Sequence, residues 1–176
     1  VRDYVVAQAE AHDCRWQLDT AGNLVVYVPA SPGRERHPTV IIQNHLDMVT
    51  VKTGDKEHDF HRDPLTLQVK DGWLLADRTT LGADNGVGCA AALALLTDPD
   101  VQHPPLELLF TVDEETGLDG ALGLDASLLS GRVMLNLETE DWHELYVGCS
   151  GGAGWVFARD YPLQPAAPGA SCWTLE

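Results

Sequence analysis

The chain has 176 residues and carries 27 acidic against 11 basic side chains, which gives a formal net charge of −16. This length allows one domain with a sizeable core but not two large ones. No basic patch offsets the negative charge, so neither nucleic acid nor an anionic membrane surface is expected as a partner. The sequence also lacks a run of about twenty apolar residues, the length that a membrane-spanning helix needs.

The start of the chain and its cysteines bear on the cellular compartment. Residues 1–6 contain neither an initiator methionine nor the apolar block of a signal peptide, which favours a cytoplasmic protein trimmed at its front. The cysteines show no Cys-x-x-Cys pairing, so free thiols in a reducing compartment are expected. There are four of them, at Cys14, Cys89, Cys149 and Cys172.

The N-terminal half of the chain alternates between helical and extended patterns. Apolar residues recur at helical intervals at its start, and short β-branched runs bounded by turn residues follow. The last of the β-branched runs before the long polar loop at 50–64 is almost continuously apolar, as in strands buried on both faces. In chain order we expect a helix at 1–12, strands at 14–19, 24–29 and 39–43, and a hairpin made of 65–69 and 73–76.

The C-terminal half begins with a glycine-rich turn at 80–88 that runs directly into an apolar helix. A second buried strand and short helical pieces come next, and a proline- and alanine-rich tail at 162–170 is typical of a linker. We expect a helix at 85–96, helical pieces at 117–124 and 126–131, and strands at 106–112, 132–138, 144–147 and 154–158.

Three of the predicted strands end in a histidine or a carboxylate. His45 ends the first, Glu114 and Glu115 follow the second, and Glu138 ends the third. Asp84 lies between them on the glycine-rich turn. Since α/β proteins keep ligands at the carboxyl ends of their strands, these side chains are expected to lie together. The pattern predicts a metal site.

Metal-assisted hydrolysis needs ligands, an open coordination position and a base that is not itself bound to the metal. Histidine nitrogen and carboxylate oxygen suit zinc, and Asp84 could bridge two ions roughly 3.5 to 4 Å apart, as in other two-metal sites. Glu114 is the candidate base, beside a ligand but on the other side of the chain. The candidate ligands are His45, Asp84, Glu115 and Glu138.

Asp47 follows His45 by two residues on an extended segment, so both side chains point the same way. A carboxylate there can hydrogen-bond the ring nitrogen that does not face the metal, which fixes the tautomer of the imidazole. His58 and His61 lie on the polar loop instead. Ligands usually occupy rigid elements, so solvated histidines are expected at these two positions.

The chain contains four characteristic motifs: Asn-His-Leu-Asp-Met-Val at 44–49, Thr-Leu-Gly-Ala-Asp-Asn-Gly at 80–86, Phe-Thr-Val-Asp-Glu-Glu-Thr-Gly at 110–117 and Gly-Cys-Ser-Gly-Gly at 148–152. Together they resemble those of the Xaa-His dipeptidases. These aminoacyl-histidine dipeptidases, also called bacterial carnosinases, belong to the di-zinc exopeptidase family that includes aminoacylases and glutamate carboxypeptidases. The resemblance extends from the first helix to about Ala158, and it implies an α/β catalytic domain with a mixed, mostly parallel sheet flanked by helices.

The resemblance also implies the ligand set of two zinc ions, for which cobalt or manganese could substitute. His45 and Glu138 would complete the shell of one zinc, Asp84 would bridge, and Glu115 would bind the second. The family commonly has a cis peptide after the bridging aspartate, which here would join Asp84 to Asn85. The implied reaction is hydrolysis of Xaa-His dipeptides such as carnosine by zinc-activated water.

Two further roles are implied by the same resemblance. Glu114 would act as general base and then as general acid, and Asp47 would orient His45. The substrate would be a small peptide, and the full-length protein would be a homodimer that associates through an inserted lid domain.

Two departures from the family pattern keep alternatives open. Dipeptidases of this group usually carry aspartate at the position of Glu138, whereas the carboxypeptidase branch carries glutamate, so an aminoacylase or carboxypeptidase is one alternative. The family's last zinc-binding histidine lies beyond the lid domain, which this chain lacks, so a degenerate, non-catalytic metal-binding domain is another. We expect residues 1–160 to be the N-terminal part of the catalytic domain, truncated before the lid, and 161–176 to be a linker or the start of the lid. Such a fragment should bind one metal well, the second poorly, and have little or no peptidase activity.

Overall fold

The computed structural model describes residues 1–139, 141, 143–148, 151–160, 162, 165, 167–171 and 173. The chain divides into two units, Val1–Trp142 and His143–Glu176, and every helix and strand described below belongs to the first. Within the described residues, no helix has both the length and the apolar character needed to cross a membrane. The expected domain boundary at residue 160 stays a prediction.

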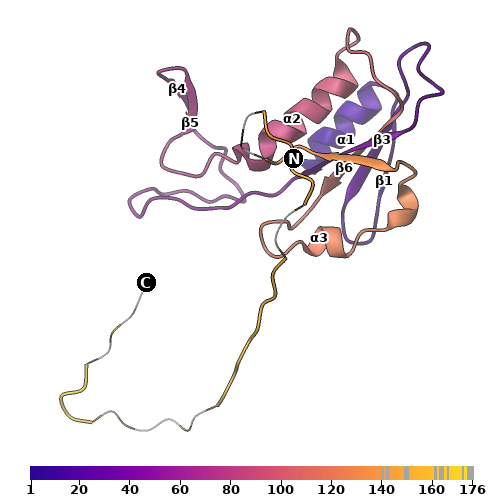
Figure 1. Ribbon diagram of the computed structural model, residues 1–176. Coiled ribbons are helices and arrows are strands. Elements are labelled where there is room, and N and C mark those ends of the chain that lie inside the picture. Colours follow the sequence, from indigo (N-terminus) through magenta and orange to yellow (C-terminus); the bar gives the residue numbers. More distant parts are fainter. Residues whose placement is uncertain are drawn as a thin grey trace. The chain divides into compact units, whose positions relative to one another are not determined.

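A five-stranded mixed sheet with the order β1-β2-β6-β3-β7 is the framework of the first unit (Figure 1). The strands are β1 (Arg15–Leu18), β2 (Leu24–Val28), β3 (Val40–His45), β6 (Leu106–Thr111) and β7 (Val133–Asn136). β1 pairs with β2, and β2 with β6, in antiparallel fashion, whereas β3 runs parallel to both β6 and β7. The predicted mixed sheet flanked by helices is confirmed, but its pairings are two parallel and two antiparallel rather than mostly parallel.

Helices cover both faces of this sheet. α1 (Arg2–Ala11) and α2 (Ala83–Thr97) lie on one face, and α3 (Asp119–Leu122) with the 3₁₀ turn η1 (Ala126–Leu128) lies toward the other (Figure 1). Side chains of a strand alternate between the two faces, so neighbouring residues enter different parts of the core. Leu108 and Phe110 pack with α1 and α2, whereas Leu109 packs near η1.

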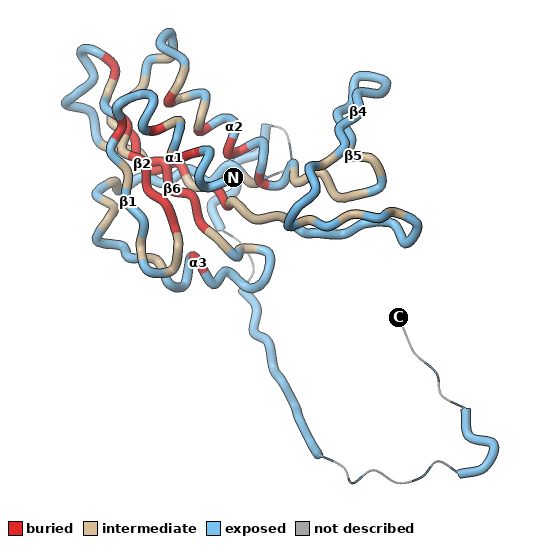
Figure 2. Tube along the Cα trace, turned by 180° about the vertical axis from the view of Figure 1, so that it is seen from behind, coloured by how far each residue is buried: buried red, intermediate tan, exposed pale blue. Residues whose placement is uncertain are grey.

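β6 is buried along its whole length because it lies inside the sheet with helices on both sides. Figure 2 shows the buried residues concentrated on the inner strands and on the sheet-facing sides of α1 and α2. The predicted strand at 39–43 is the neighbouring β3, which is largely buried as expected. The two parallel strands that precede the candidate site residues are therefore the best-anchored part of the fold.

The chain reverses its direction across the sheet at β3. It leaves β3, reaches β6 through α2 on one face, and then returns past β3 to β7 through α3 and η1. Crevices at the carboxyl ends of parallel strands, where such a reversal occurs, are where open α/β sheets bind ligands. The topology therefore points to the carboxyl ends of β3, β6 and β7.

The predicted hairpin is also confirmed, as β4 (Leu67–Lys70) and β5 (Trp73–Ala76), which form a separate two-stranded sheet. Its residues are mostly exposed (Figure 2). The polar loop before the hairpin is tied to the segment after it by two ion pairs, Lys56 to Asp77 at 2.8 Å and Arg78 to Asp55 at 3.1 Å. The loop and the hairpin thus form one connection between β3 and α2.

The strands predicted at 144–147 and 154–158 are wrong. The described residues of these segments are exposed and belong to no strand. A strand needs a neighbouring strand to complete its backbone hydrogen bonds, and no pairing is present for these residues in the described part of the chain. Cys149 and Cys172 lie outside the described residues, whereas Cys14 and Cys89 are buried free thiols, as predicted.

The central position of β6 leads to a test of the core. Phe110 is fully buried, so Phe110→Ala should lower the free energy of unfolding by about 3–5 kcal/mol, through lost burial and a residual cavity. Urea unfolding of both proteins measures this difference. Leu122→Ala is the control, since Leu122 is 80% exposed and its truncation should stay within about 0.5 kcal/mol of wild type. A Phe110→Ala variant as stable as this control would contradict the described core.

Candidate metal centre

Parallel pairing brings the candidate residues of β3, β6 and β7 to one edge of the sheet. His45 is the last residue of β3 and lies opposite Thr111, the last residue of β6. On the other side of β3, Asn136 of β7 lies opposite Gln43, so Glu138 is level with His45. The register of the sheet thus places a histidine, an acidic loop and a glutamate side by side.

His45 and two carboxylates form the closest part of this cluster. Nε2 of His45 lies 3.0 Å from Oδ1 of Asp84 and 3.3 Å from Oε1 of Glu138. The imidazole is almost completely buried, whereas the Asp84 side chain is about half exposed. One ligand atom from each of the three residues lies within 4.8 Å of the others, which makes this a group that could hold a metal ion.

A second such group shares the same histidine and consists of His45, Glu114 and Glu115. Asp84 is not part of it, so the bridging role of Asp84 stays a prediction. All the ligands predicted from the sequence therefore occur in these two groups, together with Glu114. Among the described residues, His58 and His61 belong to no group of this kind. His61 is exposed on its loop as predicted, whereas the prediction of a solvated ring is wrong for His58, whose Nε2 atom is buried without a hydrogen-bond partner.

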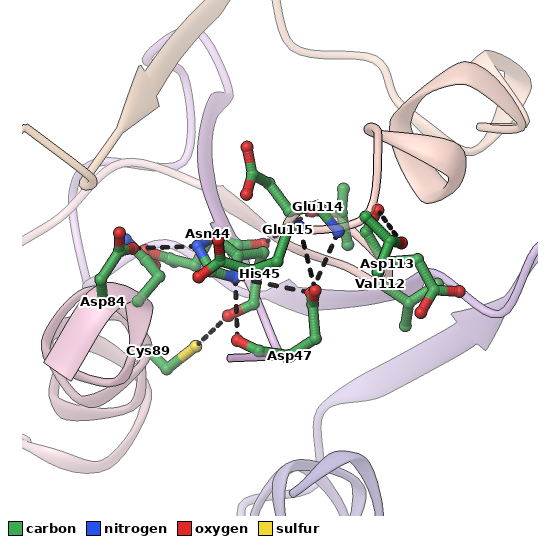
Figure 3. A network of polar contacts seen from close by, with 12 residues as sticks. Asn44, His45, Asp47, Asp84, Cys89, Val112, Asp113, Glu114 and Glu115 are labelled. Carbon is green, nitrogen blue, oxygen red and sulfur yellow. Dashed lines mark hydrogen bonds and ion pairs between the residues drawn. The ribbon is translucent and has the colours of Figure 1, made fainter. Parts of the chain in front are cut away.

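Asp47 lies beside His45 but contacts it differently from the prediction. The ring atom Nδ1 is 3.0 Å from the backbone carbonyl oxygen of Asp47 and 3.5 Å from its carboxylate (Figure 3). The carboxylate instead accepts hydrogen bonds from the backbone N–H groups of Glu114 at 3.2 Å and Glu115 at 3.1 Å. One residue thus orients the imidazole with its backbone and holds the acidic loop with its side chain.

The glycine-rich turn before α2 sets the position of Asp84. Gly82 adopts the left-handed conformation with φ of 73°, which strains any other residue, and a Cβ atom there would lie 2.7 Å from Sδ of Met48 and displace that side chain. The peptide bond between Asp84 and Asn85 is cis, as the family resemblance implied. The hydroxyl of Thr80 donates to the carbonyl of Val49 at 2.6 Å, which ties the turn to the segment after β3.

The surrounding carboxylates shift the pKa values of two groups. Burial is the largest influence on His45 and favours the neutral ring, but the hydrogen bond to Asp84, the carbonyl of Asp47 and the charge of Glu138 outweigh it and raise the pKa of His45. Burial also raises the pKa of the Glu114 carboxyl, and the charge of Glu138 adds to this increase. The site therefore retains protons to a higher pH than isolated side chains would.

One residue of the candidate site, Asn136, was not predicted from the sequence. The side-chain amide of Asn136 donates to Oε2 of Glu138 at 3.0 Å and to Oε1 of Gln43 at 2.7 Å. Gln43 in turn donates to the hydroxyl of Thr111 at 3.2 Å. The only signal in the sequence is the presence of these polar residues at alternate positions of otherwise apolar strands, on the face that carries His45.

Fold and site together define an α/β protein with a histidine- and carboxylate-lined candidate metal centre at the carboxyl ends of its parallel strands. The model of the family described as Peptidase family M20/M25/M40 matches residues 41–157, which include all of these site residues. The chain belongs to this family.

Two dipeptidases are similar to this chain over most of its length. The cytosol non-specific dipeptidase of Escherichia coli is 43% identical over 150 residues, which cover 85% of this chain but 31% of that protein. The crystal structure of aminoacylhistidine dipeptidase from Vibrio alginolyticus has a TM-score of 0.80 at 42% identity, over 84% of this chain and 30% of that one. The chain thus spans less than a third of the length of these relatives.

A more distant structure shares the fold alone. A tripeptidase from Staphylococcus aureus matches with a TM-score of 0.64 at 24% identity, over 79% of this chain and 37% of that one. The resemblance to the dipeptidases of this family, inferred from the four motifs, is confirmed by the closer relatives.

The raised pKa of His45 leads to a prediction for the metal-free chain. Protonated His45 is stabilised by its carboxylate neighbours in the folded state, so its contribution to stability is complete below the unfolded-state pKa of about 6.5. It is lost as the pH rises through the raised pKa of the folded state. Urea unfolding at a series of pH values, with a chelator present, measures this slope.

The His45→Gln variant should lack this part of the pH dependence, whereas the His37→Gln variant, at an exposed loop position, should retain it. Added zinc should reverse the trend, because protons compete with the metal for the imidazole. An identical pH dependence in wild type and His45→Gln would contradict the described surroundings of the ring.

Proposed function

We propose that this chain supplies the metal-binding half of the active site of a dipeptidase that hydrolyses Xaa-His dipeptides of the carnosine type. The observation that carries the proposal is the approach of Asp84 and Glu138 to the same nitrogen of His45, at 3.0 and 3.3 Å. Glu114, a carboxyl group with a raised pKa, lies in the adjoining group. The name of the Vibrio relative supports Xaa-His substrates, and the name of the E. coli relative supports dipeptides in general.

The donor set fits zinc. One imidazole nitrogen and two carboxylate oxygens are common zinc ligands, and three protein ligands leave a position open for water or substrate. This ion would be held by His45, Asp84 and Glu138. A second ion would be bound by Glu115 together with Asp84, whose carboxylate would bridge the two. Cobalt or manganese could substitute for zinc. When bound, the metal would supply Lewis-acid activation of a water molecule.

Glu114 is proposed as the general base and acid. Its carboxyl is half-buried, and its pKa is raised by burial and by the charge of Glu138, which brings it closer to neutral pH, where an acid–base catalyst works best. The hydrogen bond from its backbone N–H to Asp47 holds it beside the metal ligands. It would take a proton from the attacking water and pass it to the leaving amine.

Further proposals concern the whole protein rather than the described residues of this chain. We propose a cytoplasmic location, in line with the name of the E. coli relative, and homodimerisation through a lid domain.

An aminoacylase or carboxypeptidase is the second candidate function, and Glu138 favours it because the carboxypeptidase branch carries glutamate at this position. Substrate profiling with dipeptides and acylated amino acids separates the two.

The first test is zinc binding by the chain itself. We expect about one tightly bound zinc per chain, and we expect Asp84→Ala to lose it because two of the three nearest ligands cannot enclose the ion. Elemental analysis and zinc titration measure both. Asp98→Ala is the matched control, because Asp98 lies at the other end of α2 and belongs to neither metal-binding group.

Either of two results would contradict this assignment. If wild type binds no zinc, the centre is not a zinc site. If Asp84→Ala and Asp98→Ala bind zinc equally well, the ion lies elsewhere on the chain.

The adjacent glutamates provide a test of the proposed base. In a protein that contains this chain together with the remaining length of its relatives, Glu114→Gln should lower kcat by about 10²–10⁴-fold while the zinc content stays that of wild type. Glu115→Gln, the matched neighbour, should lower the zinc content as well. Steady-state kinetics with a Xaa-His dipeptide and metal analysis of the same samples distinguish a base from a ligand. Loss of zinc in Glu114→Gln would make Glu114 a ligand instead.

A further inference from the structure

The segments that carry His45, Asp84 and Glu138 are joined behind the ligand atoms by buried amide groups. Asn44 precedes His45 on β3, and Asn85 follows Asp84 at the start of α2. Both side chains are almost inaccessible to solvent, at 0% and 2% exposure. Burying an amide is costly unless its hydrogen bonds are made, so the partners of these two residues are of interest.

Asn85 links two ligand-bearing segments that lie far apart in the sequence. Its side-chain nitrogen donates to the backbone carbonyl of Leu137 at 2.8 Å, across 52 positions of the chain. Leu137 immediately precedes Glu138, just as Asn85 immediately follows Asp84. One hydrogen bond therefore ties the backbone beside one carboxylate to the backbone beside the other.

Asn44 adds the histidine to this connection. With its amide nitrogen directed toward α2, Asn44 donates to Oδ1 of Asn85 at 3.0 Å and to the carbonyl of Gly88 at 3.3 Å. The thiol of Cys89 donates to the carbonyl of His45 at 3.2 Å (Figure 3). The first two turns of α2 are thus bonded directly to the end of β3 where the imidazole is attached.

The packing around the amides leaves no space for a side chain at Gly88. A Cβ atom there would contact the side-chain amide of Asn44 and lie 2.7 Å from the carbonyl oxygen of Leu137. Only glycine lets α2 approach the ends of β3 and β7 this closely. The hydrogen bonds of Asn85 therefore operate within a fixed, tightly packed junction.

We propose that Asn85 is a positioning residue of the metal centre, which sets the separation between Asp84, Glu138 and His45 before any metal binds. This inference rests on the proposed function of the centre. Asn85 does not contact the ligand atoms; it acts through the backbones to which they are attached. Groups of this kind, behind the first ligands, typically change metal affinity by 10–100-fold when they are removed.

The test compares Asn85→Ala and Asn85→Asp with wild type in zinc titrations against a competing chelator. Both variants should bind zinc about 10–100-fold more weakly, because neither can donate to the carbonyl of Leu137. The visible absorption of the cobalt-loaded chain should also change in both. Asn85→Asp has the same size as wild type and leaves no cavity, so it separates loss of the hydrogen bond from loss of packing.

Asn23 provides the matched control. It is another fully buried asparagine, and its side chain donates to the carbonyl of Gly120 at 2.8 Å, so Asn23→Ala also removes a buried amide that joins distant segments. Asn23 contacts none of the three ligand residues. The zinc affinity and the cobalt spectrum of Asn23→Ala should therefore equal those of wild type. A purely structural role for Asn85 predicts that both asparagine variants lose stability alike and neither loses zinc affinity.

Two outcomes would overturn the proposal while leaving the metal site intact: a folded Asn85 variant that binds zinc like wild type, or an equal loss of affinity in Asn23→Ala. Should neither Asn85 variant fold, NMR of wild type decides, because the side-chain N–H resonances of Asn85 should shift when zinc is added and those of Asn23 should not. If the Asn85 resonances do not shift when zinc is added, the proposed role of Asn85 is wrong. Absence of zinc binding by wild type would instead be a failure of the proposed function.

Discussion

The crowding of carboxylates around one buried imidazole is the constraint on which the rest of this structure depends. Asp84, Glu138 and Glu114 lie close to His45, and like charges at such distances repel unless a proton or a cation offsets them. The ion pairs of Lys56 and Arg78 are made with Asp55 and Asp77 on the connection before α2, so these cations do not offset the charge at the centre. The amide of Asn136 holds the carboxylate of Glu138, and backbone N–H groups of the acidic loop hold that of Asp47. A divalent cation would supply the missing charge.

The central strands of the sheet hold the mutually repelling carboxylates in fixed positions. β3 and β6 are paired along their whole length and buried between helices, so their carboxyl ends cannot move apart without breaking the core. Asp47 then fastens the loop after β6 to the end of β3 through two backbone hydrogen bonds. The charged groups therefore lie at the edge of the most stable part of the unit, as preorganised metal sites require.

The sequence predicted which of these residues lie together because parallel strands bring residues at their carboxyl ends to one edge. His45 ends the largely buried β3, Glu114 follows the buried β6, and Glu138 follows β7, whose residues are exposed. The sequence did not predict contacts that depend on how the elements pack. The bond from Asn85 to Leu137 and the amide of Asn136 join residues that no local pattern connects. The strands expected at 144–147 and 154–158 failed for a related reason: a suitable composition forms no strand without a neighbour to pair with.

Glu138 shows how such packing contacts affect the interpretation of a single substitution. Its two oxygens have different partners, since Oε1 lies 3.3 Å from Nε2 of His45 while Oε2 accepts the amide of Asn136 at 3.0 Å. A glutamate is one methylene longer than the aspartate usual in the dipeptidases, and Asn136 fixes the end of this longer side chain beside the imidazole. The glutamate therefore keeps one carboxylate oxygen beside His45, within the group that could hold a metal ion, while its other oxygen is fixed by the sheet.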